Sequence, residues 1–374
     1  MRIFGLASSE AEYRTGRTGV GGALNSLFGE LSRHATVVDV YQPVPSALAR
    51  ARSKVATWAR NDETWRRSYK RHEPLFQAKS ARCRAEIDRR RAEIDVVLQW
   101  EFFFAPTDRF PSSVPYCVYN DWTTALIEEK YPHWLLPRVR EGINRVQGQL
   151  LRNAAYVFTF TDLARDSVIK DYGVDPSRAV TAWAGANLAQ LPDVRRDTAT
   201  DPVILLVGND YRGKGVDVLI RAMGIVRETY PTARAIVVGG TGQHELGAVP
   251  GVELRPNASK EELDKLYRQA TLFVLPTRAE AFGHAFAEAM AYRLPCIGSD
   301  TGGVPEVIDD GRTGYLVPVG DHHAVATRIM DMLAHPDRMR EMGDAGRQKV
   351  EERFTWDRVV DRMLPYLKQA AAGE

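Results

Sequence analysis

Residues 274–318 read VLPTRAEAFGHAFAEAMAYRLPCIGSDTGGVPEVIDDGRTGYLVP, and this stretch decides the fold of the C-terminal half of the chain. An apolar run ends at Pro276, and apolar residues then recur at helical spacing from Phe282 onward. The pattern predicts a strand, a sharp loop and a helix whose first turn holds Phe282, Gly283 and His284. Backbone N–H groups and the positive end of the helix dipole meet in such a turn, so the sequence predicts an anion site there.

Two glutamates, Glu280 and Glu288, stand on either side of this loop-to-helix junction. A single glutamate in such a place more often complements the helix dipole or faces solvent. The whole ordered segment favours another interpretation. The pattern E-x7-E, an apolar helix, LPCIGSD and TGGVPEVIDDGRTGYLV together resemble the nucleotide-sugar site of retaining glycosyltransferases with the GT-B fold. These enzymes form glycosyltransferase family 4, also called glycosyl transferases group 1. Within this family, the sequence somewhat resembles the lipopolysaccharide-core branch.

The resemblance implies a role for each glutamate. Glu288 would hydrogen-bond the ribose hydroxyls, and Glu280 would lie near the donor sugar as a catalytic residue. Backbone amides toward the sugar and diphosphate would come from Ala281, Phe282, Gly283 and His284. His284 and Glu288 are also helical i, i+4 neighbours, so a plain surface pair is the alternative for His284, which we do not regard as catalytic.

The loop after the apolar run VILLVG carries cationic residues, Arg212 and Lys214. In open α/β sheets ligands bind beside the carboxyl ends of strands, and a diphosphate needs cationic donors there. Lys214 and Gly215 match the "KG" of the resembled family, and the resemblance makes Lys214 and Arg212 catalytic residues that stabilise the leaving diphosphate. Arg212 is taken as the accompanying arginine and Asn209 as a donor-binding residue, since relatives often have Arg at position 209. The alternative is that both cations are exposed charges at a helix start.

Farther along, VVGGTG at 237–242 and RPNASKEEL at 255–263 resemble the family's strand-end glycine loop and the loop beside the nucleobase. Ser259 followed three residues later by Glu262 predicts a helix N-cap. The resemblance implies that Pro256 and Asn257 contact the base through backbone atoms.

In the N-terminal half, RTGRTGVGGALNSLFGEL places glycines between the first strand and a helix. The resemblance makes Gly21 and Gly22 candidates for a loop over the diphosphate and acceptor. After YCVYN, the resemblance makes Asp121 a substitute for a histidine at the reacting face of the sugar. The alternative for Asp121 is a helix N-cap before WTTALIEEKY.

Short apolar runs alternate with amphipathic stretches along both halves of the 374 residues, which predicts two parallel sheets in an α/β fold. The runs are RIFGLA, ATVVDVY, DVVLQW, YCVYND and AYVFTF, then VILLVG, RAIVVGG, VELRP, LFVLP and PCIGSD. We expect two Rossmann-like domains facing across a cleft, as in GT-B proteins. The expected bounds are 1–185 for the acceptor-side domain, 186–201 for a linker, 202–352 for the nucleotide-sugar domain and 353–374 for a helix that crosses back to the first domain.

The composition bounds the location of the protein. No run of 18 or more apolar residues appears, and the three cysteines (Cys83, Cys117, Cys296) form no C-x-x-C pair. A cytoplasmic protein is expected, or one held peripherally at the inner face of a membrane. Residues 46–93 carry fourteen Lys or Arg against six acidic residues. They predict a solvated helical pair or, alternatively, a docking surface for anionic lipid or an anionic acceptor; no signature supports nucleic acid.

Together these observations predict a retaining, hexosyl-type glycosyltransferase that moves a sugar from a nucleotide-diphosphate donor to an acceptor such as a glycan, lipid or small molecule. The donor is a substrate, so no cofactor is expected, and no D-x-D or His/Cys cluster calls for a metal. The alternatives are a nucleotide-sugar epimerase, a sugar phosphorylase or a noncatalytic nucleotide-sugar-binding protein.

Overall fold

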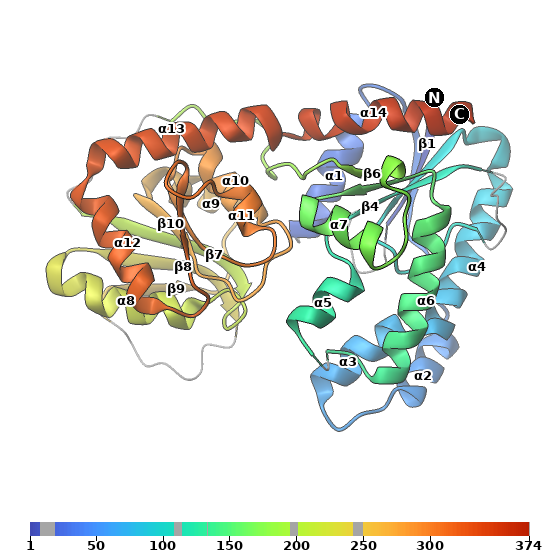
Figure 1. Ribbon diagram of the computed structural model, residues 1–374, viewed down its shortest axis with the longest axis horizontal. Helices are drawn as coiled ribbons and strands as arrows, with labels where there is room; N and C mark the ends of the chain where they lie inside the picture. The colour runs from blue at the N-terminus through green and yellow to red at the C-terminus, as the bar shows by residue number, and fades with distance from the viewer. Residues whose placement is uncertain (8–18, 108–113, 133, 195–200, 242–249, 374) are drawn as a thin grey trace. The chain divides into compact units, whose positions relative to one another are not determined.

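Two sheets of six parallel strands organise the chain in the computed structural model, which describes residues 1–7, 19–107, 114–132, 134–194, 201–241 and 250–373 (Figure 1). The sheets belong to two compact units. One consists of Met1–Trp183 with Trp356–Glu374, and the other consists of Ala184–Thr355. The predicted α/β class with two Rossmann-like sheets is confirmed. Among the described residues, no helix is both long and apolar enough to span a bilayer.

The first sheet has the order β2-β1-β3-β4-β5-β6. Its strands are β1 (Arg2–Leu6), β2 (Thr36–Tyr41), β3 (Val96–Trp100), β4 (Tyr116–Asn120), β5 (Tyr156–Thr159) and β6 (Ala179–Thr181). Helices of the same unit are α1 (Gly19–Leu31), α2 (Ala47–Ala56), α3 (Asp62–Arg71), α4 (Glu73–Arg89), α5 (Thr124–Lys130), α6 (Pro137–Asn153), α7 (Asp162–Lys170) and α14 (Trp356–Ala372). β3 and β4 are buried along their whole length, as a parallel sheet covered on both faces requires.

The second sheet has the order β12-β11-β10-β7-β8-β9. Its strands are β7 (Val203–Asp210), β8 (Arg234–Thr241), β9 (Val252–Arg255), β10 (Leu272–Leu275), β11 (Cys296–Ser299) and β12 (Gly314–Val317). Its helices are α8 (Val216–Thr229), α9 (Lys260–Gln269), α10 (His284–Ala291), α11 (Val304–Val307), α12 (His322–Ala334) and α13 (Pro336–Arg353). β7 and β10 are neighbours, so the loops that follow them lie at the same edge of the sheet.

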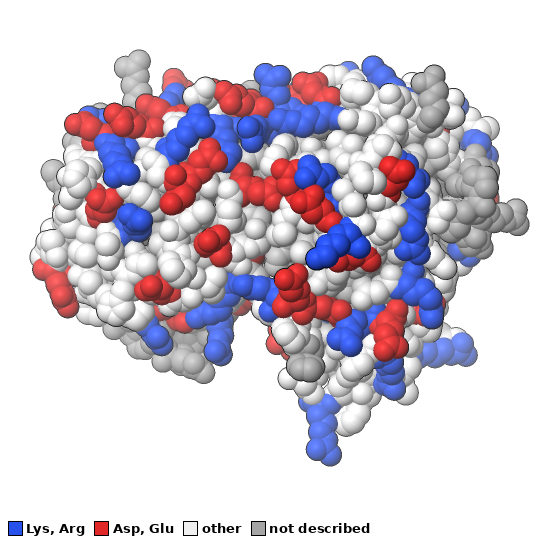
Figure 2. Space-filling view, in the orientation of Figure 1, with Lys and Arg blue, Asp and Glu red and all other residues white. Residues whose placement is uncertain are grey.

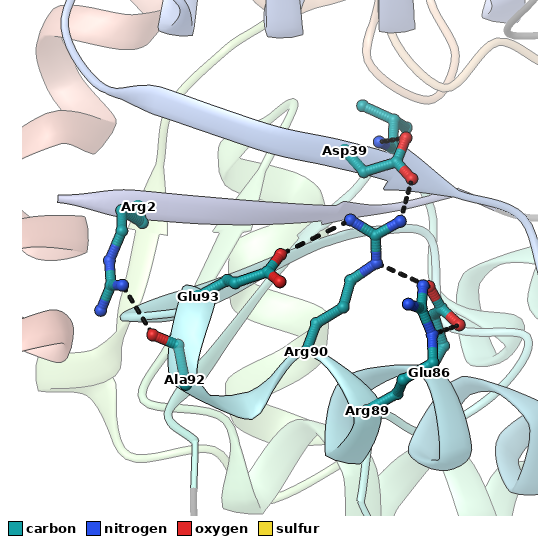
Figure 3. A network of polar contacts seen from close by, with 8 residues as sticks. Arg2, Asp39, Glu86, Arg89, Arg90, Ala92 and Glu93 are labelled. Carbon is teal, nitrogen blue, oxygen red and sulfur yellow. Dashed lines mark hydrogen bonds and ion pairs between the residues drawn. The ribbon is translucent and has the colours of Figure 1, made fainter.

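Polar contacts tie the end of α4 to the first two strands (Figure 3). Arg90 donates to Asp39 of β2 at 3.2 Å and to Glu86 of α4 at 2.7 Å. Arg2 of β1 donates to the carbonyl of Ala92 at 2.6 Å. Arg90 and its neighbours are therefore engaged within the unit, although they belong to the basic stretch 46–93.

Candidate functional site

The turn between β7 and α8 holds Lys214 in a fixed place. The backbone N–H of Lys214 donates to the carbonyl of Asp210 at 2.9 Å, and that of Gly213 donates to the Asp210 carboxylate at 3.0 Å. Gly215 then adopts φ 70° as the N-cap of α8. A Cβ on Gly215 would lie 1.9 Å from the carbonyl oxygen of Pro276, so only glycine fits between the two loops.

The loop after β10 is fastened to this turn. Thr277 donates from its hydroxyl to the carbonyl of Gly213 at 3.0 Å, and the backbone N–H of Arg278 donates to the same carbonyl at 2.8 Å. The Arg278 guanidinium binds the Asp217 carboxylate through two bonds of 2.8 Å. Burial raises the pKa of Asp217, but the hydrogen bonds and charge of Arg278 outweigh that effect and leave the pKa lowered.

Thr277 and Arg278 are residues that the sequence analysis missed. Their signal was weak: a Thr-Arg pair directly after the buried run LFVLP, before Glu280. Neither residue type at that spacing announces a contact with a turn more than sixty positions earlier in the chain.

The two loops bring Lys214 and Glu280 together, two of the predicted catalytic residues. The ammonium of Lys214 donates to the Glu280 carboxylate at 2.6 Å, and both side chains are partly buried. The Arg212 side chain is exposed, while its backbone carbonyl accepts a hydrogen bond from Arg278. Asn209 is also exposed. It is the second-last residue of strand β7 and does not belong to the following loop. At this edge of the second sheet, the contact between a predicted catalytic cation and a predicted catalytic carboxylate is therefore made by Lys214.

The loop before α10 ends in a glycine that no other residue replaces easily. Gly283 has φ 94°, and a Cβ there would lie 2.7 Å from the Phe286 ring. The helix begins at His284 rather than at Phe282, so the predicted first turn starts two residues late. The Phe282 side chain is buried and packs edge-on against Phe354 with ring centroids 5.3 Å apart. Phe282 thus offers a ligand only its backbone. Ala281 before it is partly exposed, but its methyl side chain has no polar group, so it too offers only its backbone.

His284 is tied to the segment that opens the second unit. Its Nδ1 lies 3.0 Å from the carbonyl oxygen of Gly185, and because a carbonyl only accepts, Nδ1 carries the proton. Burial lowers the pKa of His284, which keeps the ring neutral at pH 7 and leaves Nε2 as an acceptor. The sequence analysis suggested a surface pair between His284 and Glu288. The Nδ1 of His284 binds the carbonyl of Gly185 instead.

Glu288 has a buried tyrosine as its partner. The Tyr267 hydroxyl of α9 donates to Glu288 Oε2 at 3.1 Å, and the Tyr267 side chain is fully buried. Burial raises the pKa of Glu288, and hydrogen bonds from Tyr267 and Asn187 offset this only partly. The Tyr267 ring stacks on Tyr292 at 5.0 Å, which fixes the direction of its hydroxyl. Tyr267 was not singled out from the sequence, where it is one apolar position of a helix.

The α9 N-terminus is as predicted. Ser259 accepts from the backbone N–H of Glu262, and the Glu262 side chain accepts from that of Ser259, which forms a complete capping box. Asn257 is exposed in the loop just before this cap. Its proposed contact with a nucleobase stays a prediction.

The N-terminal candidates lie in the other unit. Gly21 and Gly22 belong to the first turn of α1, which begins at Gly19, so the expected glycine loop is helical at these two positions. Residues 8–18, which precede them, are outside the described part of the chain. The N-cap of α5 is Thr123, so the suggestion that Asp121 caps this helix is wrong. Asp121 instead accepts from the backbone N–H of Trp122 at 2.6 Å.

Asn120, next to Asp121, stands out at the carboxyl end of β4. Its side chain is 1% exposed, and within the described part of the chain neither its Nδ2 nor its Oδ1 has a hydrogen-bond partner. Such a group costs about 1–3 kcal/mol unless a ligand or water satisfies it. The sequence analysis weighted Asp121 and passed over Asn120, because a buried carboxamide cannot be recognised from its letter alone.

The comparison with protein families covers most of the second unit. The family model of glycosyl transferases group 1 matches residues 191–349. A D-inositol 3-phosphate glycosyltransferase of Thermobifida fusca is 32% identical over 257 residues, which cover 62% of this chain and 59% of the relative. The alpha-maltose-1-phosphate synthase of Mycolicibacterium smegmatis is 30% identical over 240 residues, or 56% of this chain and 61% of that enzyme. The chain thus spans about three fifths of the length of these relatives.

Solved structures establish the architecture. The sucrose-phosphate synthase of Thermosynechococcus elongatus superposes with a TM-score of 0.76 over 100% of both chains, at 19% identity. HepE of Anabaena, solved with UDP and glucose, superposes with a TM-score of 0.66 over 98% of this chain and 99% of its own, at 16% identity. Residues 191–349 of this chain therefore form a glycosyl transferases group 1 domain, within a protein of the GT-B fold.

Proposed function

We propose that the protein is a retaining glycosyltransferase that moves a sugar from a nucleotide-diphosphate donor to an acceptor. The observation that carries the proposal is the contact of Lys214 with Glu280 at 2.6 Å, beside the glycine turn that opens α10. A diphosphate bound there meets an ammonium group and helix-start amides, while Glu280 lies where the sugar would be. The D-inositol 3-phosphate glycosyltransferases and the maltose-1-phosphate synthase among the relatives support a hexosyl donor.

The proposed reaction places negative charge on the leaving diphosphate. The bond between the anomeric carbon and the diphosphate oxygen breaks, the acceptor oxygen bonds to the same face of that carbon, and the acceptor proton leaves with the diphosphate. Lys214 and the α10 amides stabilise the charge as it develops, which is the largest contribution that a fixed site makes. Glu280 faces the donor sugar, and Glu288 holds the ribose.

The auxiliary donor-binding roles follow the same geometry. Arg212, exposed next to Lys214, adds a second cation for the diphosphate, and Asn209 and Asn257 border the nucleotide. Ala281, Phe282, Gly283 and His284 contribute backbone groups. Gly21 and Gly22 of the first unit are assigned to the diphosphate and acceptor, and Asp121 is assigned a catalytic role at the reacting face of the donor sugar. Residues 46–93 are assigned to peripheral contact with an anionic membrane, on the strength of their charge.

The test uses Lys214→Ala with Lys368→Ala as its control, since Lys368 is an exposed lysine of α14. Stability screening against UDP, GDP, ADP and dTDP and their common sugars first identifies the donor, because a ligand that binds only the folded state stabilises it. With that donor, Lys214→Ala lowers the transfer rate by about a hundredfold or more, and Lys368→Ala leaves it unchanged. Equal rates in the two variants would refute the site.

Two further reactions are separated by the same donor. A sugar phosphorylase would need inorganic phosphate for turnover, and an epimerase would convert the donor without an acceptor. Binding of a donor with no turnover under any of these conditions would identify a noncatalytic nucleotide-sugar-binding protein.

A further inference from the structure

Helix α2 has a polar residue, Ser53, on its buried side, and its C-cap Thr57 is also buried. Ser53 and Thr57 are buried on the side that meets α3, and the Ser53 hydroxyl donates to the carbonyl of Tyr69 at 2.7 Å. The Thr57 hydroxyl donates to the carbonyl of Ser53 at 2.8 Å. An ordinary surface helix buries its apolar stripe and exposes its polar one. α2 instead buries Ser53 and exposes both its large apolar residues and its cations.

The outward side of α2 is apolar. Leu48 is 60% exposed and Val55 is 79% exposed, and these two residues lie about two turns apart on one face. Trp58, just beyond the helix, is 66% exposed, and Val44, just before it, is 49% exposed. These four are among only six large apolar side chains that are exposed in the described part of the chain, so the apolar surface is concentrated at α2.

The charges within this segment have one sign. Residues 44–60 contain Arg50, Arg52, Lys54 and Arg60 and no Asp or Glu. All four cations are exposed. A segment that exposes apolar side chains together with cations, and that contains no carboxylate, is complementary to a surface that is apolar inside and negatively charged at its boundary.

Several cations of the basic stretch contact residues of the same unit, including Lys54 of α2, whose Nζ lies 5.2 Å from the centroid of the Tyr69 ring. On α3, Arg66 pairs with Asp62 at 2.8 Å, and the Arg71 guanidinium lies 4.3 Å from the Trp134 ring. On α4, Lys79 is buried, and Arg90 binds Asp39 and Glu86 (Figure 3). Figure 2 shows blue side chains projecting at the lower end of the unit, where Figure 1 draws α2 and α3. The outward-facing apolar and cationic surface is thus a property of α2 rather than of the whole stretch.

The helix is held firmly from behind. Arg138 of α6 donates to the carbonyl of Ala56 at 2.6 Å, and the Trp65 indole N–H donates to the carbonyl of Lys54 at 2.9 Å. Ser46 caps the N-terminus by accepting from the backbone N–H of Ala49. α2 therefore presents its outer face from a fixed base and does not need to fold on contact.

We propose that α2 docks on an anionic lipid surface. Leu48, Val55 and Trp58 enter the boundary between headgroups and acyl chains, where tryptophan is favoured, and the cations contact lipid phosphates. A second copy of the chain is a poorer occupant, because a two-fold contact would bring the four cations of one 44–60 segment against the same four of the other. The proposal narrows the membrane contact assigned above to 46–93, and it holds whether or not the protein transfers a sugar.

The test is sedimentation of the full chain with vesicles of phosphatidylcholine alone or mixed with phosphatidylglycerol. The wild type binds the mixed vesicles, and added salt weakens the binding because the charges are exposed. Arg50→Gln with Arg52→Gln lowers the partition coefficient by roughly twenty-five-fold, at about fivefold for each cation. Leu48→Ser with Val55→Ser also lowers it by roughly tenfold, and both double variants keep the wild-type affinity for the nucleotide.

The matched control is Val319→Ser, which removes a 41% exposed valine from the other unit. It leaves vesicle binding unchanged. Equal binding of the wild type to neutral and mixed vesicles, or an unaltered partition coefficient in the Leu48/Val55 variant, would overturn the proposal. The proposal would also be overturned if the wild-type protein bound neither kind of vesicle and formed dimers that the Val55→Ser substitution separates into monomers. None of these outcomes bears on sugar transfer, which is measured separately with a soluble donor.

Discussion

Lys214 and Glu280 bind each other, so a diphosphate that binds Lys214 must compete with a carboxylate for it. The two side chains are 27% and 14% exposed, which places the pair between the surface and the interior. A partly solvated pair of this kind contributes about 1 kcal/mol or less. Its weakness suits a site in which the lysine is exchanged between a carboxylate and a substrate.

Glu280→Gln is therefore expected to change binding and turnover in opposite directions. The affinity for a nucleoside diphosphate rises by up to about fivefold, because Lys214 no longer has a charged competitor. The rate of sugar transfer falls, because the substitution alters Glu280, the side chain that is proposed to face the donor sugar. Calorimetric titration measures the first effect and a transfer assay the second. Glu261→Gln, an exposed residue of α9, is the control, and a Glu280→Gln protein with weaker diphosphate binding would contradict the competition.

Tyr267 positions Glu288, and this role is separable from its packing. Tyr267→Phe keeps the ring and its stacking on Tyr292 but removes the hydroxyl that donates to Glu288. Because that hydrogen bond lowers the pKa of Glu288 against the effect of burial, its loss raises the pKa further. If Glu288 holds the ribose as proposed, nucleotide affinity needs its ionised carboxylate and is lost as pH falls through this pKa. The variant therefore loses it at higher pH than the wild type does.

The measurement is nucleotide affinity as a function of pH. At neutral pH the variant binds roughly fivefold to tenfold more weakly, as expected for one hydrogen bond to a charged group. Tyr292→Phe is the matched control, since the Tyr292 hydroxyl donates to Asp264 at 2.7 Å and not to Glu288. If the two variants gave the same pH profile, the hydroxyl of Tyr267 would have no part in orienting Glu288.

At the scale of elements, the site depends on two loops that fit around each other. Gly215 has φ 70° and lies against the Pro276 carbonyl, and Thr277 and Arg278 bind the carbonyl of Gly213. Gly215→Ala forces these loops apart, so we expect a loss of about 2–4 kcal/mol in the free energy of unfolding and a loss of nucleotide binding. Gly224→Ala in the following helix α8 meets nothing within 4 Å and gains about 0.5–1 kcal/mol.

Denaturant unfolding of the two variants measures this difference in sign. The comparison is sharp because both changes add one methyl group to a glycine of the same β7–α8 segment. A Gly215→Ala protein as stable as the wild type would mean that the contact with Pro276 relaxes without cost.

The sequence predicted the elements better than the contacts between them. Apolar runs such as VILLVG and LFVLP correspond to β7 and β10, because buried parallel strands are apolar throughout. β6 (AVT) and β12 (GYLV) were not predicted, because β6 has only three residues and β12 begins at a glycine directly after the turn residues GRT. Likewise, Lys214 and Glu280 could each be named from a motif. The sequence did not predict the hydrogen bonds of Thr277 and Arg278 to Gly213, nor that of Tyr267 to Glu288. These contacts depend on tertiary packing, which local spacing in the sequence does not encode.

At the scale of the whole molecule, the chain leaves its first unit after Trp183 and returns to it at Trp356. α14 packs there against α1 and β5, with Val359, Met363 and Leu367 fully buried. Tyr156 of β5 donates to Gln369 at 2.8 Å. The helix keeps its course through Pro365, although an interior proline costs about 3 kcal/mol. Burial of a large side chain contributes about 1.5–3 kcal/mol, so several together outweigh that cost.

Leu367→Ala is expected to weaken the first unit without touching the donor site. Leu367 is 0% exposed, and its truncation leaves a cavity worth about 2–5 kcal/mol of unfolding free energy. Leu48→Ala, in the same unit but 60% exposed, changes it by less than about 0.5 kcal/mol. Because Lys214, Glu280 and Glu288 all belong to the unit Ala184–Thr355, the affinity for a nucleoside diphosphate stays at the wild-type value in both variants. Thermal unfolding and titration on the same samples measure the two quantities. Lost nucleotide affinity in Leu367→Ala, with the second unit still folded, would show that the returning helix also shapes the donor site.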